Sequence, residues 1–380
     1  MSHLHIQSPS DAQGLRAELP RARRLALDCE AAGFHRYSDR LCLVQLTTEH
    51  ATWVIDPLAF DPSELLRDPL ERPDVPVVMH GADFDLRLLR RDLGIGLGGL
   101  FDTQIAAQIL GEEGLGLSAL LESRLDVRLS KKFQRADWAE RPLSDAMLAY
   151  AADDTRYLLR LADLLREELI EAGRAAWAEE ECRALEEAAS AEPDEPDDPV
   201  LRVRGARRLS ARQVTALREA LEWRDEIARN RDRAPFRIVS DGPLIEAVAA
   251  APRGVRELAG IKGFPSRMAE EEGEDLVRRL QRVASLPDEK LRPYPKPSRR
   301  GPGRPTPEIE ELAERLKKIR NRRAAEVGLP KGTLLANAVV LDIARAAPRS
   351  LEELSAVEGM RRWKAEILGK DFLAAIRGAA

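Results

Sequence analysis

Short apolar runs near the N-terminus predict four strands, and in the first of them apolar and other residues alternate with a period of two. The predicted strands cover residues 24–30, 40–48, 51–57 and 76–81. Helical spacing follows over residues 83–94 and again over residues 101–111. Strands followed by a mixture of helices and strands predict an α/β layer fold with a mixed sheet.

The pattern changes after residue 144. Apolar spacing predicts one long helix over residues 144–173, which ends at Gly173. Residues 179–199 hold ten acids and three prolines, so this segment is expected to be a linker. A second break, over residues 291–307, is rich in Pro, Gly and Arg, and we expect it to be extended and exposed to solvent.

The segments beside these breaks are related to each other. Residues 250–264 (AAPRGVRELAGIKGF) align without gaps to residues 346–360 (AAPRSLEELSAVEGM), and seven of the fifteen positions are identical. The offset between the two copies is 96 residues. Such self-similarity predicts a duplicated helical module of about 75 residues, and not a short-period solenoid.

Composition narrows the class of protein. Hydrophobic content of 44% and charged content of 33% fit a soluble globular protein, and no apolar run is long enough for a membrane span. The N-terminus has no secretory signal pattern, and Cys29, Cys42 and Cys182 form no CxxC pair, so we expect reduced thiols in a cytoplasmic protein.

The net charge of −5 hides an asymmetry along the chain. Residues 288–380 carry 20 Lys and Arg against 13 Asp and Glu, so the rest of the chain is strongly acidic. A basic C-terminal part suggests a negatively charged partner, although solvated helix faces would explain the same counts.

Four acids and one tyrosine stand out as chemistry-bearing. Asp28 and Glu30 lie two apart on the first predicted strand, so their side chains point to one face, where burying two like charges is costly unless something neutralises them. Asp85 follows the strand over 76–81, where a βα turn brings a side chain to the sheet edge. Tyr150 and Asp154 are four apart on the long helix and share one face.

Each of these residues has an ordinary explanation on its own. Asp85, or equally Asp83, could simply be a first-turn acid that favours the helix dipole, and Tyr150 with Asp154 could lie on a solvated face. Together the four carboxylates form the oxygen ligand set that hard divalent cations prefer. Two such ions stabilise the attacking and leaving oxygens of a phosphodiester displacement, and the tyrosine hydroxyl is suited to hold the attacking water.

These residues carry a resemblance to a known family. D-x-E (Asp28, Glu30), the later HGADFD (Asp85) and Y-x-x-x-D (Tyr150, Asp154) resemble the three motifs of the DEDD-type 3′→5′ exonucleases, tyrosine subclass. The segment ADWAERPLSDAMLAYAADDTRYLL (136–159) is similar to the ribonuclease D family in particular. The duplicated modules resemble the helicase-and-RNase-D C-terminal (HRDC) domain, the second copy more divergent than the first.

The resemblance implies an α/β ribonuclease H-like exonuclease domain with a mixed sheet, followed by two all-α HRDC domains. The implied division is an exonuclease domain over 1–192, a linker over 193–207, HRDC domain 1 over 208–288, a Pro/Arg-rich linker over 289–306 and an HRDC-like domain 2 over 307–380.

The resemblance also implies roles for the motif residues. Asp28, Glu30 and Asp154 would hold one divalent ion, and Asp28 with Asp85 would serve a second; Mg²⁺ is the expected ion, with Mn²⁺ or another divalent ion as alternatives. Tyr150 would position the nucleophilic water. The implied reaction removes nucleotides one at a time from RNA 3′ ends, including those of tRNA precursors, and releases 5′-nucleoside monophosphates.

Substrate contacts are less well defined by the sequence. Relatives place an aromatic residue directly after Glu30, whereas this chain has Ala-Ala-Gly, so Phe34 or His35 is expected to substitute. Basic residues interleaved with aromatics suit a single strand, although a charged surface loop explains the same pattern. The candidates of this second kind are Lys131, Lys132, Gln134 and Trp138, with His80 as a further candidate beside the turn to Asp85.

We therefore expect a 3′→5′ exoribonuclease that acts as a monomer, with the HRDC modules as nucleic-acid-binding domains. The alternatives are a 3′→5′ DNA exonuclease and a catalytically silent RNA-binding scaffold.

Overall fold

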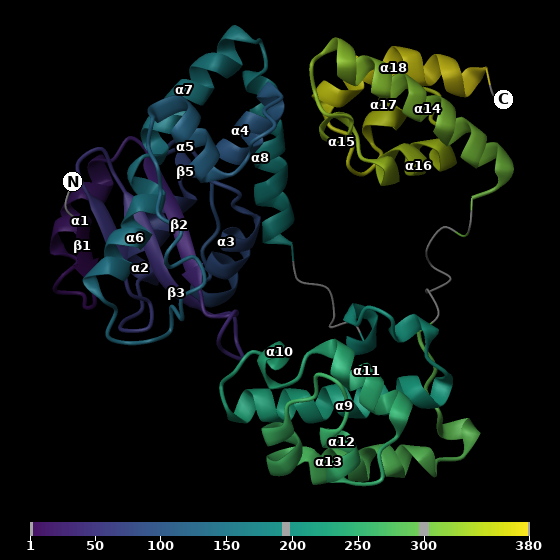
Figure 1. The fold of residues 1–380 in the computed structure, drawn as a ribbon. Coiled ribbons are helices and arrows are strands. Elements are labelled where there is room, and N and C mark those ends of the chain that lie inside the picture. The colour runs from purple at the N-terminus through teal and green to yellow at the C-terminus, as the bar shows by residue number, and fades with distance from the viewer. Residues whose placement is uncertain (1–2, 192–197, 296–302, 304, 379–380) are drawn as a thin grey trace.

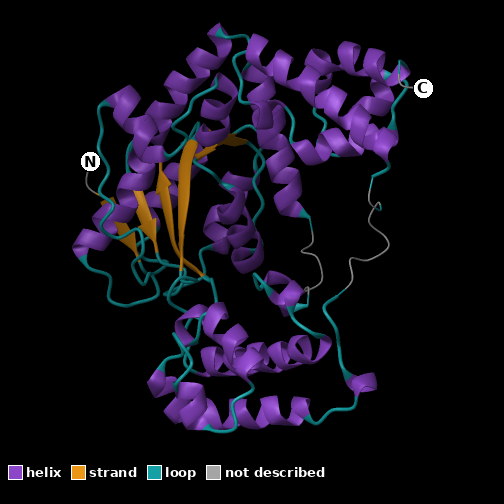
Figure 2. Ribbon diagram, turned by 45° about the vertical axis from the view of Figure 1, so that its right-hand side comes forward, coloured by secondary structure: helices purple, strands orange, loops and turns teal. Residues whose placement is uncertain are grey.

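The computed structural model describes residues 3–191, 198–295, 303 and 305–378. It contains one α/β domain and two helical domains, one below it and one beside it (Figures 1 and 2). Within the described residues, no helix combines the length and the apolar character needed to cross a lipid bilayer. Cys29, Cys42 and Cys182 are all free and buried, as expected of reduced thiols.

A six-stranded mixed sheet forms the centre of the α/β domain. Its strands are β1 (His3–Ile6), β2 (Leu25–Ala31), β3 (Leu41–Thr47), β4 (Thr52–Ile55), β5 (Val77–Met79) and β6 (Leu100–Asp102). Their order across the sheet is β1-β4-β3-β2-β5-β6. Strands β2, β3 and β4 form an antiparallel meander, whereas β5 is parallel to β2 and β6 is parallel to β5. The predicted mixed sheet is therefore confirmed.

The four predicted strands are present as β2 to β5, and the sequence pattern missed the two edge strands. Strand β1 (HLHI) contains only two apolar residues, and β6 (LFD) runs directly into α4, so neither forms a separate apolar run in the sequence.

Eight helices belong to the α/β domain. They are α1 (Gln13–Glu18), α2 (Ser63–Glu71), α3 (Asp83–Leu88), α4 (Thr103–Leu110), α5 (Leu117–Leu125), α6 (Asp145–Arg156), α7 (Leu158–Glu171) and α8 (Ala175–Ser190). Leu25, Leu27 and Cys29 of β2 pack on one face of the sheet in a cluster with Leu86 of α3 and Cys182 of α8. The opposite face, to which Asp28 and Glu30 point, is covered by α6.

Two predictions for this region are wrong. The expected single helix over 144–173 is two helices, α6 and α7, which meet at Tyr157. The break occurs because α6 packs on β2, β3 and β4 while α7 packs on α4. The acidic segment predicted as a linker over 179–199 forms most of α8, because Ala178 and Cys182 are buried against the α/β core.

The internal duplication is visible helix by helix. The first helical domain holds α9 (Ala211–Asn230), α10 (Pro235–Ile238), α11 (Asp241–Ala250), α12 (Val255–Ala259) and α13 (Ser266–Ala284). The second helical domain holds α14 (Pro307–Glu326), α15 (Lys331–Leu334), α16 (Asn337–Ala346), α17 (Leu351–Ser355) and α18 (Arg362–Arg377). Each helix of the second copy begins 96 residues after its counterpart, as the sequence offset predicts.

The two copies also share an unusual backbone conformation at equivalent positions. Ala251 and Ala347 end α11 and α16 with φ of 46° and 43°, a left-handed conformation that an alanine rarely adopts. Equivalent strain at equivalent positions is evidence for one duplicated fold.

About half of the predicted Pro/Arg-rich break over 291–307, namely residues 296–302 and 304, lies outside the described residues. Its first part is held against the first helical domain, because Arg218 donates hydrogen bonds to the carbonyl oxygens of Arg292 and Pro293. Upstream of α9, Val200, Val203 and Ala206 are buried in the same domain.

The second helical domain docks on α8. Trp363 stacks on Trp177 with ring centroids 4.8 Å apart, and its indole nitrogen donates to Glu181 at 3.0 Å. Lys364 pairs with the same glutamate at 2.7 Å. Buried side chains of α4 and α7 and of the second helical domain belong to one continuous hydrophobic cluster. The hydrophobic core of this domain is therefore continuous with that of the α/β domain.

The first helical domain docks on the loop between β2 and β3. The Tyr37 hydroxyl donates to Asp225 at 3.0 Å, and the tyrosine side chain packs against that domain's core. The backbone N–H of Ala234 donates to the carbonyl of His35 at 3.0 Å. The loop that follows the two acids of β2 is thus the anchor of a separate domain.

Candidate active site

Asp28 and Glu30 lie side by side on the central strand β2, on the face covered by α6. Strand β3 contributes seven buried residues, so this part of the sheet is largely removed from water. Ala151 and Ala152 are fully buried, and their small side chains allow α6 to lie close to the sheet. The strand acids therefore face the helix that carries Tyr150 and Asp154.

Asp85 lies in the first turn of α3, the helix that follows β5, and its side chain joins the two acids of β2. Asp102 braces the turn between β5 and α3 by accepting hydrogen bonds from the backbone N–H groups of Gly81 and Ala82 at 3.0 and 2.8 Å. Asp83, the other candidate in this turn, is exposed and paired with Arg87. Asp85 is 9% exposed, so the structure distinguishes the two acids.

Helix α6 presents the remaining two candidates. Ser144 caps its N-terminus by accepting from the N–H of Met147, which fixes where the helix begins. Asp153 pairs with Arg156 along the helix and does not join the other acids. Asp154 and Tyr150, one turn apart, are half-buried and face the sheet.

The pKa values show that these groups act on one another. Removal from water and the neighbouring Asp85 raise the pKa of Asp28 well above its ordinary value. Removal from water, followed by repulsion from Asp28, Asp154 and Asp85, raises the pKa of Glu30. Burial raises the pKa of Asp85 to about 7, with Asp102 and Asp83 contributing. Burial, with Asp28 and Asp153, raises that of Asp154 to about 8.

The tyrosine belongs to the same electrostatic unit. Burial and repulsion from Asp154, Glu30 and Asp28 raise the pKa of Tyr150, so its hydroxyl stays protonated at any physiological pH. Phe133 packs edge-on against the ring at 5.9 Å, and Trp138 lies 6.1 Å away. The ring is thereby fixed beside the carboxylates.

The structure, as far as it describes the chain, places no compensating protein cation beside this negative charge. Among the described residues, none of the four carboxylates forms an ion pair with a lysine, arginine or histidine, although the chain is rich in such pairs elsewhere. Four oxygen donors without a positive partner fit hard divalent cations. In the same described residues no group of three or more His, Cys, Asp and Glu side chains forms a ready ligand set, so the fit rests on the donor chemistry.

Gln45 is a further polar residue at this site that the sequence pattern did not single out. It lies on β3 directly opposite Asp28 in the antiparallel register and is fully buried. Neither its amide nitrogen nor its amide oxygen has a hydrogen-bond partner among the described residues. The only available signal was a glutamine inside the apolar run LCLVQLT, opposite the acid pair.

Replacing Gln45 by methionine is expected to stabilise the metal-free protein by about 1 kcal/mol, because an unsatisfied buried amide costs about 1–3 kcal/mol. Chemical denaturation in EDTA measures the change. Gln108→Met is the matched control, because the Gln108 amide donates to Thr333 at 3.2 Å and its loss should destabilise. Equal destabilisation by both substitutions would contradict the argument.

The predicted substrate-contact residues fall into two groups. Lys131, Lys132 and Gln134 are exposed on the loop before α6, and Phe34 is exposed on the β2–β3 loop. Trp138, in contrast, is 2% exposed and lies in the core below Tyr150.

The two histidines are engaged with the protein. The His35 ring bonds the carbonyl of Arg135 at 2.8 Å, and His80 bonds the Thr103 hydroxyl at 2.9 Å. Of the two residues predicted to replace the missing aromatic, Phe34 is the more exposed.

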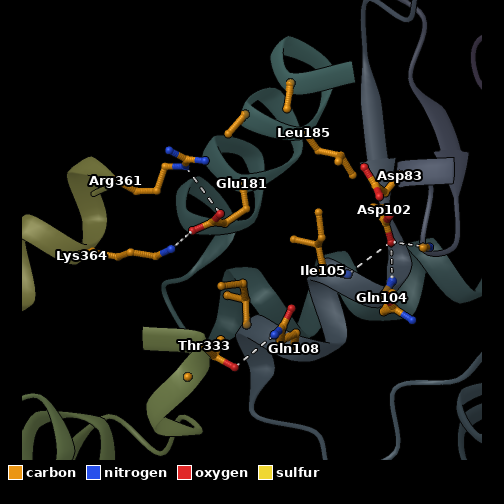
Figure 3. A pocket seen from close by; sticks show the side chains of 15 residues that line it. Asp83, Asp102, Gln104, Ile105, Gln108, Glu181, Leu185, Thr333, Arg361 and Lys364 are labelled. Carbon is orange, nitrogen blue, oxygen red and sulfur yellow. Dashed lines mark hydrogen bonds and ion pairs between the residues drawn. The ribbon is translucent and has the colours of Figure 1, made fainter. Parts of the chain in front are cut away.

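A cavity of about 440 Å³ lies between α4, α8 and the second helical domain (Figure 3). Gln104, Gln108 and Thr333 line it together with charged groups, and none of the five candidate residues does. Glu181 faces both Arg361 and Lys364 there. Because these charges compensate one another, we assign the cavity to the domain junction and not to the reaction site.

Comparison with known proteins agrees with this geometry. A family model described as a 3′–5′ exonuclease matches residues 5–170, and the HRDC domain model matches residues 213–280 and 309–376. Ribonuclease D of Pseudomonas paraeruginosa is 30% identical over 93% of this chain and 92% of its own length.

Solved structures match over the whole chain. A crystal structure of a protein from Bifidobacterium adolescentis has a TM-score of 0.81 and 25% identity, covering 98% of this chain and 96% of that one. Escherichia coli RNase D shares the fold with a TM-score of 0.71, 24% identity and coverage of 100% and 99%. The chain belongs to the ribonuclease D family and is a 3′–5′ exoribonuclease with two C-terminal HRDC domains.

Proposed function

We propose that this enzyme removes single nucleotides from RNA 3′ ends by hydrolysis at a site built from Asp28, Glu30, Asp85, Asp154 and Tyr150. The supporting observation is the shared, uncompensated negative charge of the four carboxylates, each of which has a raised pKa. Four carboxylates that repel one another are suited to bind divalent cations, and bound cations would stabilise the transition state of phosphodiester hydrolysis.

In this proposal Asp28, Glu30 and Asp154 hold one divalent ion and Asp28 with Asp85 holds the second. When bound, the two ions stabilise the attacking and leaving oxygens of the displaced phosphodiester. Mg²⁺ is the proposed ion because carboxylate oxygens are its preferred protein ligands, and Mn²⁺ would use the same ligands.

Tyr150 orients the attacking water in this proposal. Because its hydroxyl stays protonated, it serves as a hydrogen-bond partner and does not remove the proton. Attack on the terminal linkage then releases a 5′-nucleoside monophosphate and leaves a new 3′ hydroxyl. We propose tRNA precursors as the substrate class, and a monomeric enzyme that works in the cytoplasm, where its three free thiols stay reduced.

The function is tested with a 5′-labelled tRNA that carries extra 3′ nucleotides, incubated with the full-length protein and Mg²⁺ beside a DNA of the same sequence. Shortening of the RNA in single-nucleotide steps, with nucleoside 5′-monophosphates as products, is the expected result. An RNA blocked by a 3′ phosphate is the control. Shortening of DNA alone, or of neither polymer with Mg²⁺ or Mn²⁺, would reject the proposal.

Mg²⁺ should stabilise the protein more at pH 8.5 than at pH 6. The folded protein holds Asp85 and Asp154 with pKa values of about 7 and 8, whereas the unfolded chain ionises near pH 4. The folded state therefore binds more protons, and the metal-free stability falls as pH rises from about 4 through these raised values. Thermal unfolding at both pH values measures the effect, and an equal Mg²⁺ shift at both would contradict it.

A further inference from the structure

Two half-exposed phenylalanines from different domains meet beside the proposed active site. Phe34, on the loop after β2, is 43% exposed, and Phe236, on α10 of the first helical domain, is 50% exposed. Their ring centroids are 5.7 Å apart. We call this pair the aromatic platform. Contiguous exposed aromatic surface of this kind calls for a partner.

Positively charged side chains surround the platform. The Arg237 guanidinium lies 4.7 Å from the centre of the Phe34 ring, and that of Arg135 lies 5.9 Å from it. Neither forms an ion pair within the described part of the chain, whereas nearby Arg36 is paired with Asp137. Arg135 is exposed, whereas Arg237 is half-buried and its Nε–H donates to the carbonyl of Phe34 at 2.8 Å. Both guanidinium groups keep further N–H donors that can meet phosphate groups.

The platform is close to the proposed chemistry. Phe34 is four residues after Glu30, so their Cα atoms are at most about 14 Å apart. The loop before α6 connects the two places from the other side. Its Phe133 packs on Tyr150 at 5.9 Å, and two residues later Arg135 reaches Phe34. The platform is therefore within a few nucleotides' reach of Tyr150.

The two domains touch through this surface, since Phe236 packs on Phe34, yet both rings stay about half exposed, which docking does not require. The first helical domain is already held by Tyr37, which is packed into its core and bonded to Asp225. The duplication supplies an internal comparison, because Phe236 and Arg237 correspond to Gly332 and Thr333 at the offset of 96 residues. The second copy forms the equivalent helix α15 without an aromatic residue.

We propose that the aromatic platform binds the single-stranded RNA segment just upstream of the scissile nucleotide, stacking its bases on Phe34 and Phe236 while Arg135 and Arg237 pair with its phosphates. Aromatic rings beside basic groups are the features that bind single strands without sequence preference. This inference rests on the proposed function and deepens it. Through Phe236 and Arg237, the first helical domain would align the substrate strand directly.

Binding of a labelled single-stranded oligoribonucleotide, measured by fluorescence anisotropy in EDTA, tests the platform without requiring catalysis. Phe236→Ala should weaken binding about 5- to 150-fold, because each base–aromatic stack contributes about 1–3 kcal/mol. Phe236→Trp should retain the affinity. Arg135→Gln should lower the salt dependence by about one phosphate contact. Leu351→Ala, at an exposed residue of the second helical domain, should change nothing.

Hydrolysis separates failure of the platform from failure of the proposed function. With Mg²⁺, Phe236→Ala should lower kcat/KM for a long single strand and leave that for a dinucleotide unchanged, because a dinucleotide is too short to reach the platform. Unchanged long-strand affinity in Phe236→Ala, or equal losses on both substrates, would overturn the platform. A wild-type protein that binds the strand in EDTA and hydrolyses neither substrate would overturn the proposed function alone.

Discussion

Asp28→Asn is expected to lower kcat for RNA shortening by about a thousandfold or more. Asp28 is the one carboxylate assigned to both proposed metal ions, so the amide removes a charged ligand from each. Stabilisation of transition-state charge by a bound metal contributes several kcal/mol, and about 4 kcal/mol corresponds to a thousandfold in rate. Single-turnover kinetics with the labelled tRNA measures the loss.

The same substitution should make the metal-free fold more stable at pH 8.5, because it removes a carboxyl group that is costly to ionise where it stands. Asp83→Asn is the matched control, since Asp83 is exposed, paired with Arg87, and lies in the turn beside Asp85. Its activity should stay within twofold of wild type. Loss of activity in both variants, or in neither, would contradict the assignment of Asp28.

Tyr150→Phe is expected to lower kcat by about a hundredfold while leaving the Mg²⁺-induced rise in melting temperature unchanged. The hydroxyl is proposed to orient the attacking water, and misplacing a reacting group by about 1 Å can cost about a hundredfold in rate. Because the pKa of Tyr150 is raised, the pH dependence of the wild-type rate should show no titration from this residue in the physiological range. Pre-steady-state kinetics and thermal unfolding give the two readouts.

Tyr157→Phe is the control for Tyr150→Phe. Tyr157 lies at the junction of α6 and α7 and packs against the hydrophobic cluster, so removing its hydroxyl should not alter kcat. A Tyr150→Phe enzyme within twofold of wild type would show that the water is oriented by other groups.

The candidate site could be predicted from the sequence because its signals are local. The spacing of Asp28 and Glu30 on a strand and of Tyr150 and Asp154 on a helix defines which side chains share a face. The choice between Asp83 and Asp85 could not be made in this way, since both are first-turn acids. Burial decides between them, and burial depends on how the whole turn packs against β6 and α4.

The wrong predictions have physical causes of the same kind. Nothing in the local sequence at Tyr157 interrupts a helix, because the break arises from two different packing surfaces. The many acids of residues 179–190 give this segment the composition of a linker, and only their contact partners show that it is a docked helix. Glu180 accepts from the N–H of Arg362, 182 residues later, and Glu181 meets Trp363 and Lys364. Contacts of this range cannot be obtained from composition.

The docking of the second helical domain on α8 also affects how the protein is made. The α/β domain is synthesised first, yet Trp177 receives its stacking partner Trp363 only 186 residues later. At about 5–20 residues per second, the ribosome needs roughly 10–40 s to deliver that partner. During this interval the nascent chain presents an uncovered apolar helix face, so co-translational chaperones have a defined window in which to bind it.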